Sequence, residues 1–321
     1  MRDGYMNEDV MISVAMATYN GERFLHEQID SILAQTHQNF ELVICDDCST
    51  DGTAGILREY ETQDSRIHVY VNESNLGFKK NFERAISLCK GEYIALSDQD
   101  DVWLPEHLEK LLSIIGTADI ACGNALMVDA DGKPTGKMLN EIDNLYFFDA
   151  EKSLFRILFF TGPFQGASML IKSAFVKRLL PFPEGVFAHD AWMAACSCFG
   201  SGIVYTFDAI TKYRQHGNNV TFSTHNKKSR NIFEKSISRV RIFFGGVKVD
   251  RFCYCDELAA LYGTDSKPFC EIYKVIKRIE KRHFCIQDIR FFWKNYEWIM
   301  TQKGHSGFLK RLISWSRWRR A

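Results

Sequence analysis

Short apolar runs alternate with amphipathic segments along the first part of the chain. Four runs rich in β-branched residues predict buried strands, at 11–17, 40–45, 67–71 and 92–96. The segments between them place apolar residues at helical spacing and predict helices at 24–34, 53–60 and 79–89. Strands that alternate with helices imply right-handed crossovers and a sheet covered on both faces. We therefore expect an α/β fold with an open, mostly parallel sheet.

The alternation continues less regularly beyond the fourth run. Further strands are expected at 120–128, 167–171 and 203–205, with a hairpin-type turn at 129–132, and further helices at 154–160, 173–180 and 191–199. From about Asn226 the chain changes to Lys- and Arg-rich helical segments with aromatic stripes. We place a domain boundary there, which divides the chain into an α/β domain at 1–225 and a basic helical C-terminal region at 226–321.

Polar side chains follow three of the predicted strands. Thr18-Tyr19-Asn20 follows the first, Asp46-Asp47 the second, and Asp98-Gln99-Asp100-Asp101 the fourth. Open α/β sheets bind ligands outside the carboxyl ends of their strands. The sequence therefore predicts that these residues meet in one crevice.

The three aspartates at 98, 100 and 101 have two interpretations. Carboxylates this close repel one another, so a folded chain keeps them in water or neutralises them with a cation. Mg²⁺ or Mn²⁺ commonly bridges one or two carboxylates to substrate phosphates, which favours a nucleoside diphosphate ligand. The alternative is a solvated acidic turn in which Asp101 caps the following helix and Pro105 lies near its start. A similar capping role is open to Ser49 or Thr53 before the second helix.

Composition adds a charge asymmetry to this picture. The 321 residues are 46% hydrophobic and carry no net charge, which is typical of a globular protein. Up to Thr224, however, 31 acidic residues outweigh 18 basic ones, and from His225 onward 22 basic residues outweigh 9 acidic ones. The C-terminal region is therefore expected to meet an anionic partner, which is either the acidic domain or a membrane surface.

The compartment follows from the cysteines and the absence of a long apolar run. No stretch of about 18 uncharged apolar residues occurs, and the N-terminus lacks an apolar signal-peptide core. Most of the 10 cysteines lie in apolar periodic segments, which suits reduced thiols. We expect a cytoplasmic protein, with peripheral attachment to the inner face of the membrane as a further hypothesis.

Six groups of residues together resemble family two of the inverting glycosyltransferases, which have the GT-A fold. The resemblance covers about residues 10–222. The sequences around Asp100 and Arg214 are similar to those of a bacterial rhamnosyltransferase-like branch. In chain order the groups are Thr18-Tyr19-Asn20, Asp46-Asp47-x-Ser49-x-Asp51-Gly52-Thr53, Asn75-x-Gly77 with Asn81, Asp98-x-Asp100-Asp101, His189-Asp190 and Arg214-Gln215-His216.

The resemblance implies a donor site for a nucleoside-diphosphate sugar, UDP- or dTDP-linked. Asp98 is expected on its ribose side, Asp100 as the ligand of Mg²⁺ or Mn²⁺, His216 as a further metal ligand, and Arg214 as a fork to the phosphates. The residues expected to hold the nucleoside are Thr18, Tyr19, Asn20 and Asp47.

Asp190 is the residue expected to act as the catalytic base. An inverting transfer needs one carboxylate on the acceptor side to take the proton of the attacking hydroxyl. Many relatives have an acidic residue where this chain has His189, so three roles stay open for the histidine: tuning Asp190, binding the acceptor, or beginning the helix. The acceptor is expected to be a glycan or a lipid-linked saccharide, and L-rhamnose is the candidate for the transferred sugar. No nucleic-acid partner is expected. The alternative function is a non-catalytic nucleotide-sugar or glycan-binding module on the same fold.

The last 21 residues form a basic, aromatic segment. Residues 301–321 hold six Lys or Arg residues and no acid, with Phe308, Leu309, Leu312, Ile313 and Trp315 on one side of a helical wheel. Such helices lie in the headgroup region of anionic membranes. A helix packed on the acidic domain is the competing interpretation.

Overall fold

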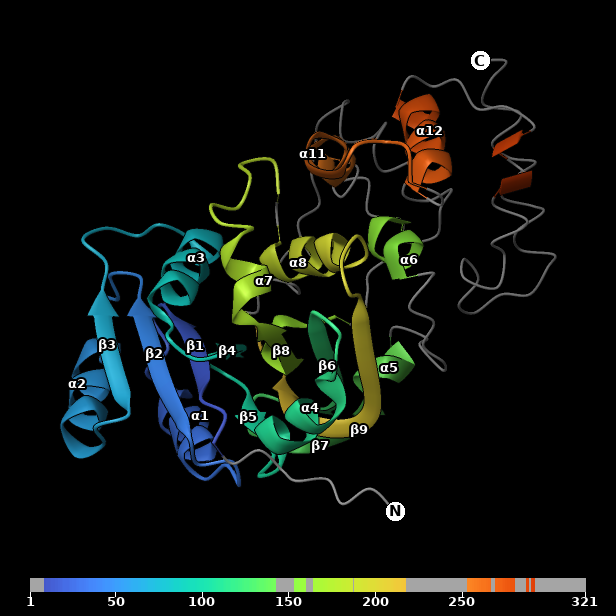
Figure 1. Cartoon of the computed structure of the whole chain (residues 1–321). Helices are drawn as coiled ribbons and strands as arrows, with labels where there is room; N and C mark the ends of the chain where they lie inside the picture. The colour runs from blue at the N-terminus through green and yellow to red at the C-terminus, as the bar shows by residue number, and fades with distance from the viewer. Residues whose placement is uncertain are drawn as a thin grey trace.

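A single mixed sheet organises the computed structural model, which describes residues 9–142, 153–159, 164–186, 188–217, 253–266, 269–280, 287–288 and 290–291. Among these residues the strand order is β3-β2-β1-β4-β8-β6-β9-β5, and β7 pairs with the C-terminal part of β6, at Leu126 and Val128. The expected α/β, GT-A type fold is confirmed, and Figure 1 shows the helices arranged around the sheet.

The strands are β1 Ile12–Thr18, β2 Phe40–Asp46, β3 Ile67–Val71, β4 Tyr93–Asp98, β5 Val102–Trp103, β6 Ile120–Val128, β7 Pro134–Met138, β8 Met169–Lys172 and β9 Ile203–Arg214. The helices are α1 Leu25–Leu33, α2 Thr53–Gln63, α3 Phe78–Leu88, α4 His107–Ile115, α5 Leu139–Ile142, α6 Ser153–Phe159, α7 Ser173–Lys177, α8 His189–Ser197, α11 Cys253–Tyr262 and α12 Phe269–Glu280, with a 3-10 turn at Gly166–Ser168. None of the helices within the described ranges is long and apolar enough to cross a membrane.

The parallel half of the sheet aligns the strand ends. β1 lies between β2 and β4 and is parallel to both, with Thr18 beside Asp46 and Ala17 beside Asp98. The second half is mixed, because β8 runs antiparallel to both β4 and β6 while β9 runs parallel to β6. The ends of β1, β2 and β4 therefore lie side by side, as the sequence predicts.

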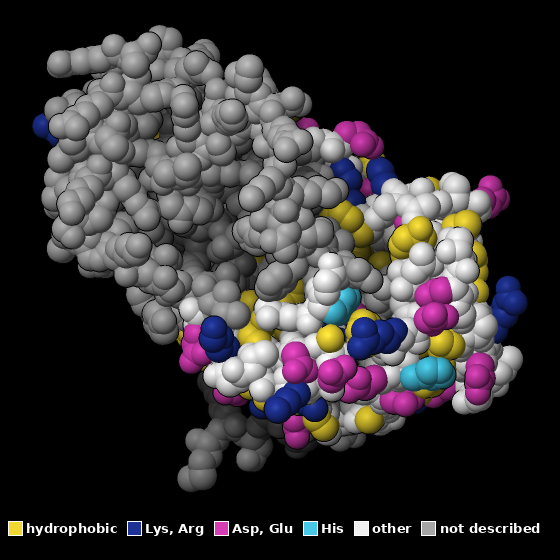
Figure 2. Space-filling view, turned by 180° about the vertical axis from the view of Figure 1, so that it is seen from behind, with side chains coloured by type: hydrophobic (Ala, Val, Ile, Leu, Met, Phe, Trp, Pro, Cys, Tyr) yellow, Lys and Arg dark blue, Asp and Glu magenta, His cyan; other side chains and the backbone are white. Residues whose placement is uncertain are grey.

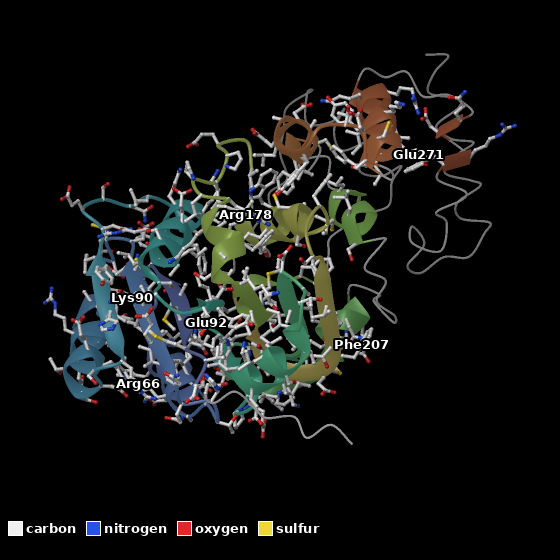
Figure 3. The ribbon with its side chains drawn as sticks, in the orientation of Figure 1. Arg66, Lys90, Glu92, Arg178, Phe207 and Glu271 are labelled. Atoms are coloured by element: carbon white, nitrogen blue, oxygen red, sulfur yellow. The ribbon has the colours of Figure 1, made fainter. Side chains whose placement is uncertain are left out.

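Alternating side chains along the strands separate two hydrophobic clusters. Ile12, Val14 and Met16 of β1 face the cluster formed with α1, α2 and α4, while Ala15 faces the cluster formed with α3, α7 and α8. This period of two is what a strand buried on both faces requires. The ribbon with side chains shows the division, with Arg66 on the α2 side and Arg178 on the α7 side (Figure 3).

The helices α11 and α12 belong to the second cluster. Tyr254, Leu258, Phe269 and Ile276 are buried in the same apolar cluster as Trp192 of α8. Both helices accordingly lie on the α8 side in Figure 1, and Glu271 of α12 is labelled there in Figure 3. The predicted boundary at residues 225 and 226 and the basic segment 301–321 both fall outside the described residues.

Two capping predictions are wrong. Gly52, not Ser49 or Thr53, is the N-cap of α2, and the Ser49 hydroxyl instead donates to Asp46. Asp101 does not cap α4, because the short strand β5 follows it and Glu106 is the N-cap.

Strand β9 is much longer than the expected 203–205. It extends to Arg214 because its second half pairs with both β6 and β5.

Candidate active site

The carboxyl ends of β1 and β2 are joined by buried hydrogen bonds. The Thr18 hydroxyl donates to Asp46 Oδ1 at 2.9 Å, and the Asp47 amide donates to the Thr18 carbonyl at 2.8 Å. Thr18 is only 1% exposed. Its observed role is therefore to hold the two strand ends together, and its predicted contact with the nucleoside stays a prediction.

Asp47 organises the loop that precedes α3. Its carboxylate accepts hydrogen bonds from the Leu76 amide at 2.7 Å, the Gly77 amide at 2.8 Å and the Asn72 side chain at 2.7 Å. Gly77 has φ of 80°, a left-handed conformation that glycine adopts without the steric cost of a side chain. Asp47 thus fixes this wall of the crevice, and its predicted contact with the nucleoside is untested.

Tyr19 and Gln99 connect the ends of β1 and β4. The Gln99 side chain accepts from the Tyr19 amide at 2.8 Å and donates to the Tyr19 carbonyl at 3.0 Å. A Cβ atom at Gly21 would lie 2.3 Å from Gln99 Oε1, so glycine makes room for this amide. The Tyr19 side chain is 47% exposed, which leaves its ring available to a base. Sequence reasoning missed Gln99, and its position inside the carboxylate cluster was the available signal.

Asn20 shapes the loop after β1. Its φ is 49°, and its side-chain oxygen accepts from the Thr50 amide at 2.8 Å. The Asn20 amide donates to the Ser49 hydroxyl at 2.9 Å. Asn20 therefore ties the β1 loop to the β2 loop, while its predicted donor contact stays a prediction.

Asp100 and His216 form the metal-compatible part of the site. His216 Nε2 lies 2.7 Å from Asp100 Oδ2, and the two side chains are 11% and 16% exposed. Carboxylate oxygen and imidazole nitrogen suit Mn²⁺, and carboxylate oxygen suits Mg²⁺. Within the described ranges no three His, Cys, Asp or Glu side chains are grouped to hold a metal ion. This pair fits an ion that takes its remaining ligands from donor phosphates and water.

Like charges converge on Asp98. Burial, followed by the charges of Asp100 and Asp190, raises the pKa of its carboxyl from 3.8 to about 7. Asp190 thus lies close enough to Asp98 to repel it, although the two residues come from α8 and β4. The site concentrates negative charge that a cation would stabilise.

We expect the metal-free protein to lose stability as pH rises from about 4 to about 7, because folded Asp98 keeps a proton that the unfolded chain has released. Asp98→Asn should remove that dependence and raise the free energy of unfolding at pH 8 by on the order of 1–2 kcal/mol, allowing for partial solvent screening. Thermal denaturation in EDTA at several pH values measures both. Parallel pH profiles for the two proteins would contradict the expectation.

Arg214 is buried beneath the Asp100 turn and is 2% exposed. Its Nε donates to the Asp100 carbonyl at 2.8 Å, one terminal nitrogen donates to the Ala130 carbonyl at 3.2 Å, and the other bonds the Glu27 carboxylate. The expected fork to the phosphates stays a prediction, because the guanidinium contacts that the structure describes are to protein oxygens. Arg214 holds the backbone that carries Asp100.

Asp101 is a buried structural carboxylate. It is 0% exposed, and its Oδ1 accepts from the Arg214 amide at 3.0 Å. Burial, followed by the charges of Asp100 and Asp98, raises its pKa well above the usual value. Asp101 therefore joins β9 to the Asp100 turn and points away from solvent, which the acidic-turn interpretation did not anticipate.

Asp190 begins the other side of the site. It lies in the first turn of α8, and it is the one residue of that helix that is not buried. A Cβ atom at Gly166 would lie 3.6 Å from Asp190 Cβ and 3.7 Å from Leu96 Cδ1 of β4, so α8 starts close to the sheet. Its Oδ1 accepts from the Ala191 amide at 2.6 Å, and its charge acts on Asp98 at the end of β4.

His189 packs among aromatic rings as the first residue of α8. Its ring stacks on Phe82 with centroids 4.3 Å apart, and Phe78 and Phe182 each lie at 6.2 Å. It is 6% exposed, its ring nitrogens have no hydrogen-bond partner, and burial lowers its pKa. These contacts favour the helix-starting role among the three that the sequence left open.

A family model described as Glycosyl transferase family 2 matches residues 13–179. The chain is 37% identical over 146 residues to TuaG of Bacillus subtilis, which is 44% of this chain and 58% of TuaG. It is 30% identical over 213 residues to the uncharacterized glycosyltransferase MJ1057 of Methanocaldococcus jannaschii, covering 63% and 69% of the two chains.

A shorter match leads to WfgD of Escherichia coli, named as a UDP-Glc:alpha-D-GlcNAc-diphosphoundecaprenol beta-1,3-glucosyltransferase. The identity is 36% over 108 residues, which is 34% of this chain and 42% of WfgD. The chain thus spans about half the length of several curated relatives that it matches, including TuaG and WfgD.

Two solved structures share the fold at low identity. S. aureus TarS 1-349 in complex with UDP-GlcNAc aligns with a TM-score of 0.54 and 18% identity, over 92% of this chain and 97% of that one. The mannosyltransferase PcManGT from Pyrobaculum calidifontis, in complex with GDP-Man and Mn²⁺, aligns with a TM-score of 0.56 and 15% identity, over 95% and 85%.

Proposed function

The chain belongs to glycosyltransferase family 2, and from this premise we propose that it moves a sugar from a nucleoside-diphosphate donor to a hydroxyl of a saccharide acceptor with inversion. One observation carries the proposal. Asp98, the Asp100–His216 pair and Asp190 reach one crevice from β4, β9 and α8. A carboxylate opposite a metal-compatible pair is what an enzyme needs and a binding module does not, so we favour catalysis over the non-catalytic alternative.

Asp190 is assigned the role of general base. Its carboxylate takes the proton of the acceptor hydroxyl as that oxygen attacks the anomeric carbon. The new sugar–oxygen bond forms on the face opposite the departing diphosphate, and the anomeric configuration inverts. The partial exposure of Asp190 on an otherwise buried helix lets an acceptor reach it.

Asp100 and His216 are assigned to hold Mg²⁺ or Mn²⁺. A divalent ion there would offset the negative charge that develops on the leaving diphosphate. Arg214 and Asp101 hold the Asp100 backbone in place before donor binds. The assignment is in keeping with the Mn²⁺ in PcManGT, whose fold this chain shares.

The donor is assigned to the UDP- or dTDP-linked sugars. TarS was solved in complex with UDP-GlcNAc and WfgD is named for UDP-Glc, so both support UDP-sugars as the first donors to test. The similarity to the rhamnosyltransferase-like branch adds dTDP-L-rhamnose. The test is a screen of nucleoside-diphosphate release from UDP-, dTDP- and GDP-sugars with Mn²⁺, with Mg²⁺ and with EDTA. We expect one metal-dependent donor. Release at the full rate in EDTA would remove the metal from the proposal.

The acceptor is assigned to glycans or lipid-linked saccharides of polysaccharide biosynthesis, and the enzyme to the cytoplasmic face of a membrane. The diphosphoundecaprenol-linked acceptor in the name of WfgD supports a lipid-linked substrate. Acidic and basic side chains are interspersed on the described part of the face in Figure 2. The proposed membrane contact is the segment 301–321, which holds six Lys or Arg residues and no acid.

We expect the full chain to sediment with anionic vesicles at low salt, because each Lys or Arg near such a surface adds on the order of 1 kcal/mol. A variant truncated after Lys303 keeps one of the six basic residues of the segment 301–321 and should stay in the supernatant. Neutral vesicles and high salt serve as controls. Equal sedimentation of the two proteins would show that the segment is no anchor.

A further inference from the structure

Tyr254 of α11 contacts the backbone directly before Asp190. Its hydroxyl accepts from the Ala188 amide at 2.9 Å and donates to the Ala188 carbonyl at 3.3 Å. Tyr254 is fully buried, and Ala188 is half-buried. The Tyr254 side chain, which comes from the C-terminal part of the chain, therefore bonds both the amide and the carbonyl of Ala188.

Ala188 is the N-cap of α8 and has no side-chain oxygen to bond the next amides. The Tyr254 hydroxyl does not replace that cap bond, but it holds the amide and the carbonyl of the N-cap residue itself. Helices usually begin at Ser, Thr, Asp or Asn, whose side chains bond the first free amides. Ala188 has an extended conformation with φ of −119° and ψ of 119°, and no side-chain cap bond forms there. Its carbonyl accepts the first helical bond, from Trp192 at 3.1 Å. The Tyr254 hydroxyl therefore fixes from outside the residue where α8 starts.

Other contacts hold the same stretch on either side. Trp192 packs its ring edge against Tyr254, with centroids 6.0 Å apart and planes at 81°. Before Ala188, Lys79 of α3 donates to the carbonyls of Pro183, Glu184 and Val186 at 2.8–3.1 Å. The backbone that leads into Asp190 is thus held by contacts with α3 and with α11.

We propose that Tyr254 is a positioning residue that sets where α8 begins and so aims the Asp190 carboxylate at the acceptor hydroxyl. The inference rests on the proposed function, because it gives Asp190 the role of base. It makes α11 part of the catalytic unit, although this helix lies beyond the residues 13–179 that the family model matches. Tyr254 itself is not expected to touch substrate.

Tyr254→Phe removes the hydroxyl and keeps the ring. We expect kcat to fall about tenfold, because displacing a reacting group by about 1 Å can lower a reaction rate by up to about 100-fold. The affinity for UDP with Mn²⁺, measured by calorimetry, should not change. Hydrogen exchange should accelerate in the peptide that contains residues 188–190 and not in β1 or β2.

Tyr262→Phe is the matched control on the same helix. The Tyr262 hydroxyl bonds the Cys196 side chain, and its ring stacks on Phe199 at 4.5 Å. It therefore contacts α8 and the chain after it, but not the start of that helix. This variant should keep kcat while losing a comparable amount of stability, which separates positioning from a general loss of packing.

A double-mutant cycle with Asp190→Asn decides the proposal. If Tyr254 acts through Asp190, Tyr254→Phe should have little further effect on kcat once the base is gone. A tenfold loss that persists in the Asp190→Asn background, or an equal loss in Tyr262→Phe, would overturn the positioning role alone. An Asp190→Asn variant with full activity would instead overturn the assignment of the base, and the positioning role with it.

Discussion

Asp100→Ala is expected to abolish nearly all sugar transfer. The substitution removes the carboxylate that lies 2.7 Å from His216 Nε2, and with it the oxygen assigned to the divalent ion. A single lost electrostatic stabiliser of a leaving group typically costs about 100- to 1,000-fold in rate, and loss of the ion itself should cost more. Release of the nucleoside diphosphate at saturating donor and Mn²⁺ measures the effect.

Asp131→Ala is the control for the loss of one negative charge. Asp131 lies in the turn between β6 and β7, its side chain is 86% exposed, and it pairs with Arg23 at 3.4 Å. Surface pairs of this kind contribute little, so the variant should keep full activity. Calorimetry should show that Asp100→Ala binds UDP equally with and without Mn²⁺, whereas the parent protein and Asp131→Ala bind it more tightly with the ion. An active Asp100→Ala would move the metal site elsewhere.

Asp190→Asn should lower kcat by about 100- to 10,000-fold, which is the usual contribution of a general base. The amide keeps the shape of the side chain but cannot accept the proton of the hydroxyl. Because Asp190 lies on α8 and the residues expected to hold the nucleoside follow β1 and β2, the affinity for UDP should survive. A rate measurement and a UDP titration on the same preparation separate the two effects.

Asp208→Asn provides the matched amide substitution at a remote site. Asp208 is 67% exposed on β9 and pairs with Lys110 at 3.7 Å, so neither rate nor affinity should change. If Asp190→Asn instead lost affinity for UDP and rate to the same extent, Asp190 would be a donor ligand and the base would have to be sought elsewhere.

The first half of the fold could be predicted because β1, β2 and β4 are almost entirely buried, whereas β3 at the edge of the sheet is half-buried. Apolar, β-branched runs place β1 to β4 within two residues of their observed bounds, and the strand ends predict the crevice. The predicted strand ends at residue 205 because the middle of β9 is exposed, at Phe207 and Asp208, which are 39% and 67% exposed. Its pairing with β6 and β5 depends on contacts that no local pattern contains.

The sequence predicts which residues form the site better than it predicts their hydrogen-bond partners. Asp98, Asp100, His216 and Asp190 do converge. Arg214, however, was expected at the phosphates, and the structure places its guanidinium against Glu27, which lies 187 positions away in the chain. Such partners are set by tertiary packing, so spacing along the chain could not reveal them.

The position of Arg214 late in the sequence also sets an order for assembly during synthesis. The ribosome releases chains N-terminal end first, at about 5–20 residues per second, so β1 to β4 can pair long before β9 emerges. Until then Asp101 lacks the Arg214 amide that it accepts from, and Asp100 lacks His216. A nascent chain can therefore hold a folded parallel sheet while it is still unable to engage donor.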